Sequence, residues 1–139
     1  MDDFTFFRMV AGELECDTVR AKEVIAAVFQ ELHARLTPKE ADDVAAQLPT
    51  TLGILWAKGD RGDRTVASTQ LPEFLAHVRS RAGLTDGEAA ERAVKVVFAA
   101  LQELLGGRRG LDGEAWDVFS QLPKDLKMLW LAAGEQKDG

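Results

Sequence analysis

Short segments of the first half of the chain recur in the same order in the second half. FFRMV at residues 6–10 resembles FLAHV at 74–78, VFQEL at 28–32 resembles VFAAL at 97–101, and EADDV at 40–44 resembles EAWDV at 114–118. QLP and LW follow in both halves. Because ordered self-similarity is the sequence signature of a repeat architecture, we predict two tandem copies, residues 1–59 and 72–139, joined by a linker over 60–71.

Each copy is predicted to be helical throughout. Apolar residues in the longest segment of the first copy follow 4-3-4-4 spacing, which is one stripe of a helix with 3.6 residues per turn. This stripe consists of Ala21, Ile25, Val28, Leu32 and Leu36. The second copy repeats the stripe. The sequence therefore predicts four helices per copy, at 3–14, 18–36, 38–47, 49–57, 72–82, 86–105, 113–121 and 123–133.

Helix-capping residues support these boundaries. Asp17 is the predicted N-cap of the helix over 18–36. Thr37 begins a capping box in which Glu40 is predicted to reach back to the amide of Thr37, and Thr85 with Glu88 repeats this box in the second copy. Glycines occupy the positions where left-handed C-caps are expected. These glycines are Gly59, Gly83, Gly106 and Gly134.

A segment of about 60 residues buries only a thin core when it folds alone. We therefore predict that the two four-helix repeats pack on each other around a pseudo-twofold axis and bury the two long helices between them. The predicted fold class is all-α, with both repeats in one compact domain.

Composition and charge exclude several classes of function. The 139 residues contain 17 Lys+Arg and 23 Asp+Glu, a formal net charge of −6, which makes nucleic-acid binding an unlikely role because phosphate contacts need clustered basic residues. No apolar run reaches the roughly 18 residues of a membrane span, and the first residues are acidic, unlike a signal peptide. A single cysteine, Cys16, is typical of a reducing compartment. We expect a cytoplasmic protein without a membrane partner.

The sequence shows no catalytic constellation and no metal-ligating motif. His77 follows Glu73 by four residues, but a metal site needs further ligands and no H-E-x-x-H or C-x-x-C is present, so a surface Glu–His pair on one helix is predicted. His33 is predicted to face the surface. Cys16 lies among acidic neighbours and is predicted to be partly buried and unreactive. The prediction is therefore a protein that is not an enzyme and has no cofactor and no metal.

Three tryptophans and one arginine pair are the candidates for a packing or interaction role. Trp56 and Trp130 occupy equivalent positions in the two copies, which predicts that both close the end of a repeat core. Trp116 has no aromatic counterpart in the first copy and is the better candidate for an exposed contact. Arg108 and Arg109 lie in a Gly-rich insertion, where they would suit an acidic or phosphate partner. Trp116, Arg108 and Arg109 form the predicted interaction surface.

The repeated pattern resembles one known protein family. The residues that carry the resemblance are Phe74-x-x-x-Val78, the helical stripe from Ala90 to Leu101, and the Ala-x-Gln-Leu-Pro element that ends at Pro49. They resemble the prokaryotic family called domain of unknown function twenty-two sixty-seven, over nearly the whole chain. The resemblance implies a duplicated, all-helical bacterial protein with no agreed activity, cofactor or catalytic residues.

The leading hypothesis is a non-enzymatic helical module that binds another protein, including a second copy of itself. One alternative is a carrier of small molecules or lipids with an apolar cavity between the repeats. Another is weak nucleic-acid binding through arginines of the less acidic second copy, at Arg79, Arg81, Arg108 and Arg109.

Overall fold

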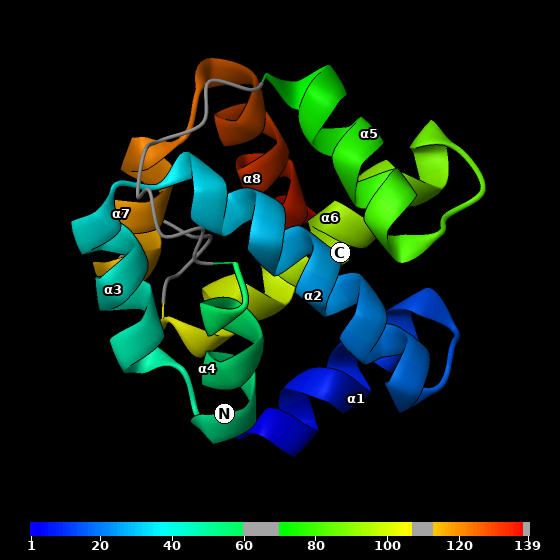
Figure 1. Ribbon diagram of the computed structural model, residues 1–139, viewed down its shortest axis with the longest axis horizontal. Coiled ribbons are helices and arrows are strands. Elements are labelled where there is room, and N and C mark those ends of the chain that lie inside the picture. Colours follow the sequence, from blue (N-terminus) through cyan, green and yellow to red (C-terminus); the bar gives the residue numbers. More distant parts are fainter. Residues whose placement is uncertain (60–69, 107–112, 138–139) are drawn as a thin grey trace.

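Eight α-helices and no strand make up the part of the chain that the computed structural model describes, residues 1–59, 70–106 and 113–137 (Figure 1). The helices are α1 (Asp3–Leu14), α2 (Thr18–Arg35), α3 (Pro38–Gln47), α4 (Thr50–Ala57), α5 (Leu71–Ala82), α6 (Gly87–Leu104), α7 (Gly113–Gln121) and α8 (Lys124–Lys137). The predicted all-α fold is confirmed. Every helix end lies within one residue of its predicted position except the C-terminus of α8. Most of the predicted linker, residues 60–69, lies outside the described residues.

The N-terminal caps mostly follow the sequence prediction. The side chain of Asp17 accepts a hydrogen bond from the amide of Arg20 at 2.8 Å, and the hydroxyl of Thr37 accepts one from the amide of Glu40 at 3.2 Å. In the second capping box the prediction that Thr85 caps the helix is wrong. Asp86, the residue directly before the helix, accepts from the amide of Ala89 at 2.8 Å, because only this position brings a side-chain oxygen to the third helical amide.

The C-terminal caps show two errors of prediction. Gly83 adopts the left-handed conformation, with φ of 64°, and ends α5 as expected. Gly134 instead lies inside α8, which continues to Lys137. At the end of α4 the cap is Lys58 in a right-handed conformation, and Gly59 is needed for a different reason. A Cβ at Gly59 would stand 3.2 Å from the Cα of Gln30, a tight contact, so glycine favours the close approach of the end of α4 to α2.

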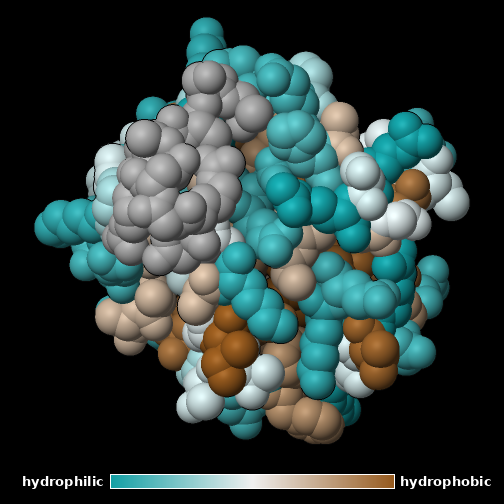
Figure 2. Space-filling model, viewed as in Figure 1, coloured by the Kyte–Doolittle hydropathy of each residue, from teal (hydrophilic) through white to brown (hydrophobic). Residues whose placement is uncertain are grey.

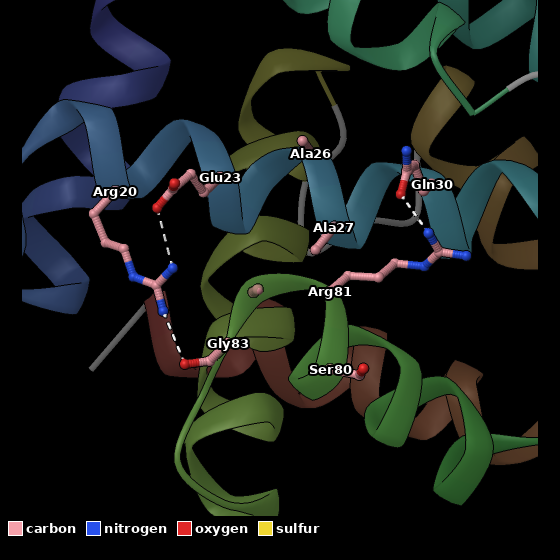
Figure 3. Close-up of a pocket in the computed structure, with 9 residues that line it drawn as sticks. Arg20, Glu23, Ala26, Ala27, Gln30, Ser80, Arg81 and Gly83 are labelled. Atoms are coloured by element: carbon pink, nitrogen blue, oxygen red, sulfur yellow. Dashed lines mark hydrogen bonds and ion pairs between the residues drawn. The ribbon is translucent and has the colours of Figure 1, made fainter.

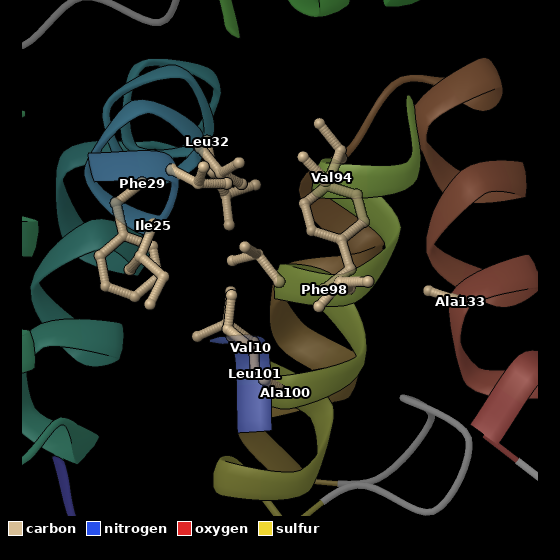
Figure 4. Close-up of a cluster of buried hydrophobic side chains, with 14 of the residues drawn as sticks. Val10, Ile25, Phe29, Leu32, Val94, Phe98, Ala100, Leu101 and Ala133 are labelled. Carbon is tan, nitrogen blue, oxygen red and sulfur yellow. The ribbon is translucent and has the colours of Figure 1, made fainter. Parts of the chain in front are cut away.

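The core is built on the two long helices, α2 and α6, which contact each other directly. Helix α1 packs on both of them, and so does α5. If α1–α4 are called the first segment and α5–α8 the second, the first helix of each segment contacts the long helix of the other segment. Figure 4 shows Val10 of α1 between the apolar side chains of α2 and those of α6. Residues at this centre are at most 1% exposed, and they include Val10, Ile25, Phe29, Leu32, Val94, Phe98 and Leu101.

Each segment contains a stack of three aromatic rings. In the first, Phe29 lies 6.2 Å from Phe6 and 5.3 Å from Trp56, between ring centroids. In the second, Phe98 lies 6.3 Å from Phe74 and 4.9 Å from the ring of a tryptophan at the equivalent position, Trp130. The predicted packing role of the two tryptophans is confirmed, since Trp56 is 1% exposed and Trp130 is fully buried. The pseudo-twofold relation between the segments stays a prediction.

The tryptophan of the first stack also positions α3. The indole nitrogen of Trp56 donates a 2.9 Å hydrogen bond to the carbonyl oxygen of Ala41, so α4 holds the middle of α3. Helix α3 in turn contacts α7, and the two lie side by side at the left of Figure 1. The third helices of both segments therefore meet, and their buried residues Ala41, Val44, Ala115 and Val118 belong to the same core.

The surface is mainly polar. On the face in Figure 2 apolar side chains form separate patches on a hydrophilic background, which is ordinary for a folded domain. The large apolar side chains that are exposed are Met1, Phe4, Val19, Ile54, Trp116 and Met128. Among the described residues, none of the helices combines the length and the apolarity that crossing a bilayer requires.

Candidate functional site

Four carboxylates lie at the contact between α3 and α7. Glu40 and Asp43 are three residues apart on α3, and Glu114 and Asp117 are three residues apart on α7. Residues at this spacing lie on one face of a helix. Since α3 and α7 pack against each other, the acidic residues of one helix are brought to those of the other.

The carboxylate cluster, defined as Glu40, Asp43 and Glu114, is compact and partly closed to solvent. One carboxylate oxygen from each residue lies within 4.8 Å of the other two. Glu40 is only 8% exposed, while Asp43 and Glu114 are partly buried. The Oε1 atom of Glu40 and the Oε2 atom of Glu114 are buried and have no hydrogen-bond partner among the described residues. Lys39, a largely exposed side chain, contacts the Oδ2 atom of Asp43 at 3.0 Å.

Burial and like charge disfavour ionisation of Glu40. Desolvation of its carboxyl group raises the pKa of Glu40 to about 8, and the neighbouring carboxyl of Glu114, followed by Asp117 and Asp43, acts in the same direction. The cluster therefore keeps a proton on Glu40 at neutral pH, which Glu40 donates to Glu114 and which relieves the repulsion among the carboxylates.

This arrangement differs from the capping box expected for Glu40. The amide of Glu40 does bond to Thr37, but its carboxyl group lies beside Asp43 and Glu114 instead of turning back to the start of the helix. The sequence does not predict this cluster, because its residues match no metal-binding motif. Its signal is the repeated E-A-x-D-V segment, at 40–44 and 114–118, because the two helices that carry this segment, α3 and α7, contact each other.

A pH-dependent stability follows from Glu40. Its folded-state pKa lies above the ordinary value of 4.5, so the folded protein holds a proton that the unfolded chain releases, and stability falls as pH rises through the interval from 4.5 to about 8. We expect the free energy of unfolding, measured with urea and a chelator, to fall by about 2–3 kcal/mol between pH 6 and 8.5. Glu40→Gln removes this titration and should unfold at a higher urea concentration than the wild type at pH 8.5. If the free energy of unfolding changes with pH by the same amount in both proteins, the assignment to Glu40 is contradicted.

Of the three predicted interaction residues, the structure describes Trp116. Trp116 lies on α7 between Glu114 and Asp117, is 47% exposed, and stacks on Phe119 with 5.5 Å between ring centroids. Lys127 of α8 places its ammonium group 5.5 Å from the centroid of the Phe119 ring. Arg108 and Arg109 lie outside the described residues.

A buried carboxylate joins α2 to α5. Glu31, 6% exposed, accepts a 2.8 Å hydrogen bond from the Nε atom of Arg81, and its other oxygen lies 2.8 Å from Nδ1 of His77. The expected surface pair of His77 with Glu73 is therefore not what forms, because α5 turns His77 toward the neighbouring helix. Arg79 donates to the carbonyl oxygen of Thr85 at 3.0 Å.

An open crevice of about 410 Å³, lined by Arg81 among others, lies between α2 and the end of α5. Figure 3 shows Arg20 reaching from α2 to the carbonyl oxygen of Gly83, and Arg81 reaching from α5 to the side-chain oxygen Oε1 of Gln30. Both arginines are thus engaged in bonds that tie the two segments together.

Comparison with known proteins identifies one matching family. The family described as "Uncharacterized conserved protein (DUF2267)" matches residues 4–129. The chain belongs to this family. None of the curated proteins matches the chain. The resemblance to this family that the repeated pattern indicates is confirmed. The matched residues begin in α1 and end within α8, so they include all three residues of the carboxylate cluster.

The remaining predicted residues of this DUF2267 chain have structural positions. Cys16 is partly buried at the start of α2, and burial together with the charge of Asp17 raises the pKa of its thiol, which makes the thiolate scarcer. His33 does not simply face the surface as predicted. Its ring lies over that of Trp56, with 5.0 Å between centroids, because α2 and α4 pack closely there.

Proposed function

We propose that this DUF2267 chain is a non-enzymatic helical module that binds another protein through the outer face of α7. The observation that carries the proposal is Trp116, an aromatic residue that is 47% exposed on a helix whose opposite face is fixed by α3. Large aromatic side chains supply much of the energy of protein interfaces at little cost in conformational entropy. The single Cys16 supports a cytoplasmic setting.

The surface around Trp116 is preorganised. Phe119 supports the indole from the same helix, with 34° between the two ring planes, and Lys127 approaches Phe119 from α8. A side chain held by neighbours loses less freedom on binding than a free one. The aromatic pair of Trp116 and Phe119 can therefore act as a rigid anchor.

Charge favours a basic partner. The exposed residue Asp117 follows Trp116 directly on α7, and the chain carries a net charge of −6. Like charge opposes the pairing of two copies through this face, whereas a partner segment with an apolar side chain next to Lys or Arg complements it. An arginine or lysine stacked on Trp116 would add a cation–π contact.

The two alternative functions have less support. The side chains between α2 and α6 are packed against each other and at most 1% exposed, which gives no support to a carrier with an apolar cavity at that place. Arg79 and Arg81 both bond within the protein, which does not favour their use for phosphate contacts. A protein partner fits the described surface better than either a lipid or a nucleic acid.

The test compares three immobilised baits: wild type, Trp116→Ala, and Ile54→Ala as a control at another exposed apolar residue on α4. We expect wild type and Ile54→Ala to retain the same basic protein from a lysate of the source cells, and Trp116→Ala to retain at least tenfold less of it. Raising the salt concentration should elute this partner.

Light scattering after size exclusion checks self-association in parallel. A monomer is expected for all three proteins. Equal retention of all proteins by the three baits, or a wild-type dimer that Trp116→Ala separates, would overturn the proposal of a basic partner.

A further inference from the structure

The carboxylate cluster has the composition and the geometry of a cation site that no pattern in the sequence announces. We infer that Glu40, Asp43 and Glu114 bind one divalent cation between α3 and α7. This inference is independent of the proposed protein partner, since it concerns the inner contact of the two helices and not the outer face of α7.

The spacing of the oxygens suits a single ion. Oxygen ligands bind Ca²⁺ at about 2.3–2.6 Å and Mg²⁺ at about 2.0–2.1 Å, so two oxygens on opposite sides of one ion are about 4–5 Å apart. One oxygen from each of the three residues lies within 4.8 Å of the others. This spacing allows one ion to contact all three oxygens.

Two unpartnered buried oxygens point to a ligand independently of the acidic composition. Glu40 is more than nine-tenths buried, and its Oε1 atom accepts no hydrogen bond from any described residue. The Oε2 atom of Glu114, directly across the helix contact, is also buried and unpartnered. Buried polar atoms in folded proteins are almost always satisfied. Without a cation, the proton that Glu40 retains and donates to Glu114 relieves this pair, and a bound cation would replace that proton and satisfy both oxygens at once.

The local charge also favours a cation. Within the cluster the one contact with a basic side chain that the described residues make is that of Lys39 with Asp43. The Lys39 side chain is 87% exposed, so it can leave Asp43 at little cost in free energy. Asp117 adds a further negative charge close enough to act on Glu40.

The ligand atoms select the class of cation. Three carboxylates with no histidine or cysteine among them are hard oxygen donors, which suit Ca²⁺, Mg²⁺ and Mn²⁺ better than Zn²⁺ or Cu²⁺. Water molecules would complete the coordination sphere, because three side chains supply fewer ligands than these ions take. A cation held in this way would bridge α3 and α7 and thereby join the two segments.

Mn²⁺ is the probe, because its binding is read directly from the loss of the free-ion signal in electron paramagnetic resonance. We expect one Mn²⁺ per full-length chain with a Kd between about 10 and 100 µM, competed by Ca²⁺. Saturating Mn²⁺ should raise the Tm by several degrees, since a ligand that binds only the folded state stabilises it. Glu40→Gln and Glu114→Gln should each weaken Mn²⁺ binding at least tenfold.

Two further variants keep the result independent of folding defects. Glu73→Gln alters an exposed carboxylate on α5 and should leave the Kd unchanged. Lys39→Met removes the competing ammonium group and should tighten Mn²⁺ binding two- to fivefold, a gain that misfolding cannot produce. The inference is overturned if 1 mM Mn²⁺ or Ca²⁺ neither binds nor shifts the Tm of the wild type, or if Glu40→Gln binds as tightly as the wild type. The first of these results would leave the cluster as a proton-sharing acid pair only.

Discussion

Residues 1–59 produced alone are expected to lack cooperative folding. Helix α1 buries Val10 against α6, and α2 packs Ile25 and Leu32 toward the same helix, so removal of the second segment exposes the centre of the core. The Glu31 carboxylate would also lose Arg81, its partner on α5. A fragment of this size that has lost much of its buried surface cannot offset the entropy of ordering the chain.

Circular dichroism tests this expectation. The fragment should show reduced helicity and a gradual thermal change, where the full chain shows one sharp transition. Mixing it with residues 70–139 should restore helicity, because every contact between the segments is noncovalent except the linker. A fragment that melts cooperatively, with the Tm of the full chain, would show that the segments fold independently.

Trp56→Ala is expected to lower the free energy of unfolding by about 3–5 kcal/mol, the range for deleting a large buried ring. The indole is 1% exposed, stacks on Phe29, and donates to the carbonyl oxygen of Ala41. The substitution therefore leaves a cavity in the first segment and a buried carbonyl without its donor, and it loosens the attachment of α3.

Trp56→Phe is the matched control, because it keeps a ring in the stack and removes the hydrogen bond to Ala41. This variant should lose about 1–2 kcal/mol, close to the cost of a buried acceptor left unsatisfied. Urea unfolding followed by circular dichroism measures both. If Trp56→Ala lowers the free energy of unfolding by less than about 1 kcal/mol, the aromatic stack is not a main source of stability in the first segment.

The helices could be predicted from the sequence because the signals that set their ends are local. Asp17 and Thr37 cap the helices that follow them through atoms three residues away, and the apolar stripe of α2 reports its buried face directly. The errors arose where tertiary packing decided. Gly59 is a close contact with α2, and α8 continues through Gly134 although glycine is a common helix end.

The carboxylate cluster could not be predicted by the same rules. Glu40 satisfies the pattern of a capping box, and nothing local distinguishes that role from burial against another helix. The decisive fact is the contact of α3 with α7, which joins residues far apart in sequence. The repeated E-A-x-D-V segment indicates which residues share a position in the two copies, and the two equivalent aromatic stacks support the duplication it suggests.

Glu40 of α3 and Glu114 of α7, at equivalent positions of the repeated E-A-x-D-V segment, meet in one partly buried cluster. The titration of the Glu40 side-chain carboxyl carbon by nuclear magnetic resonance, in the metal-free protein, tests it most directly. With Glu40 buried beside Glu114, the midpoint should lie near pH 8, and Glu114→Gln should lower it. A midpoint near the ordinary value of 4.5, unchanged by Glu114→Gln, would contradict the cluster.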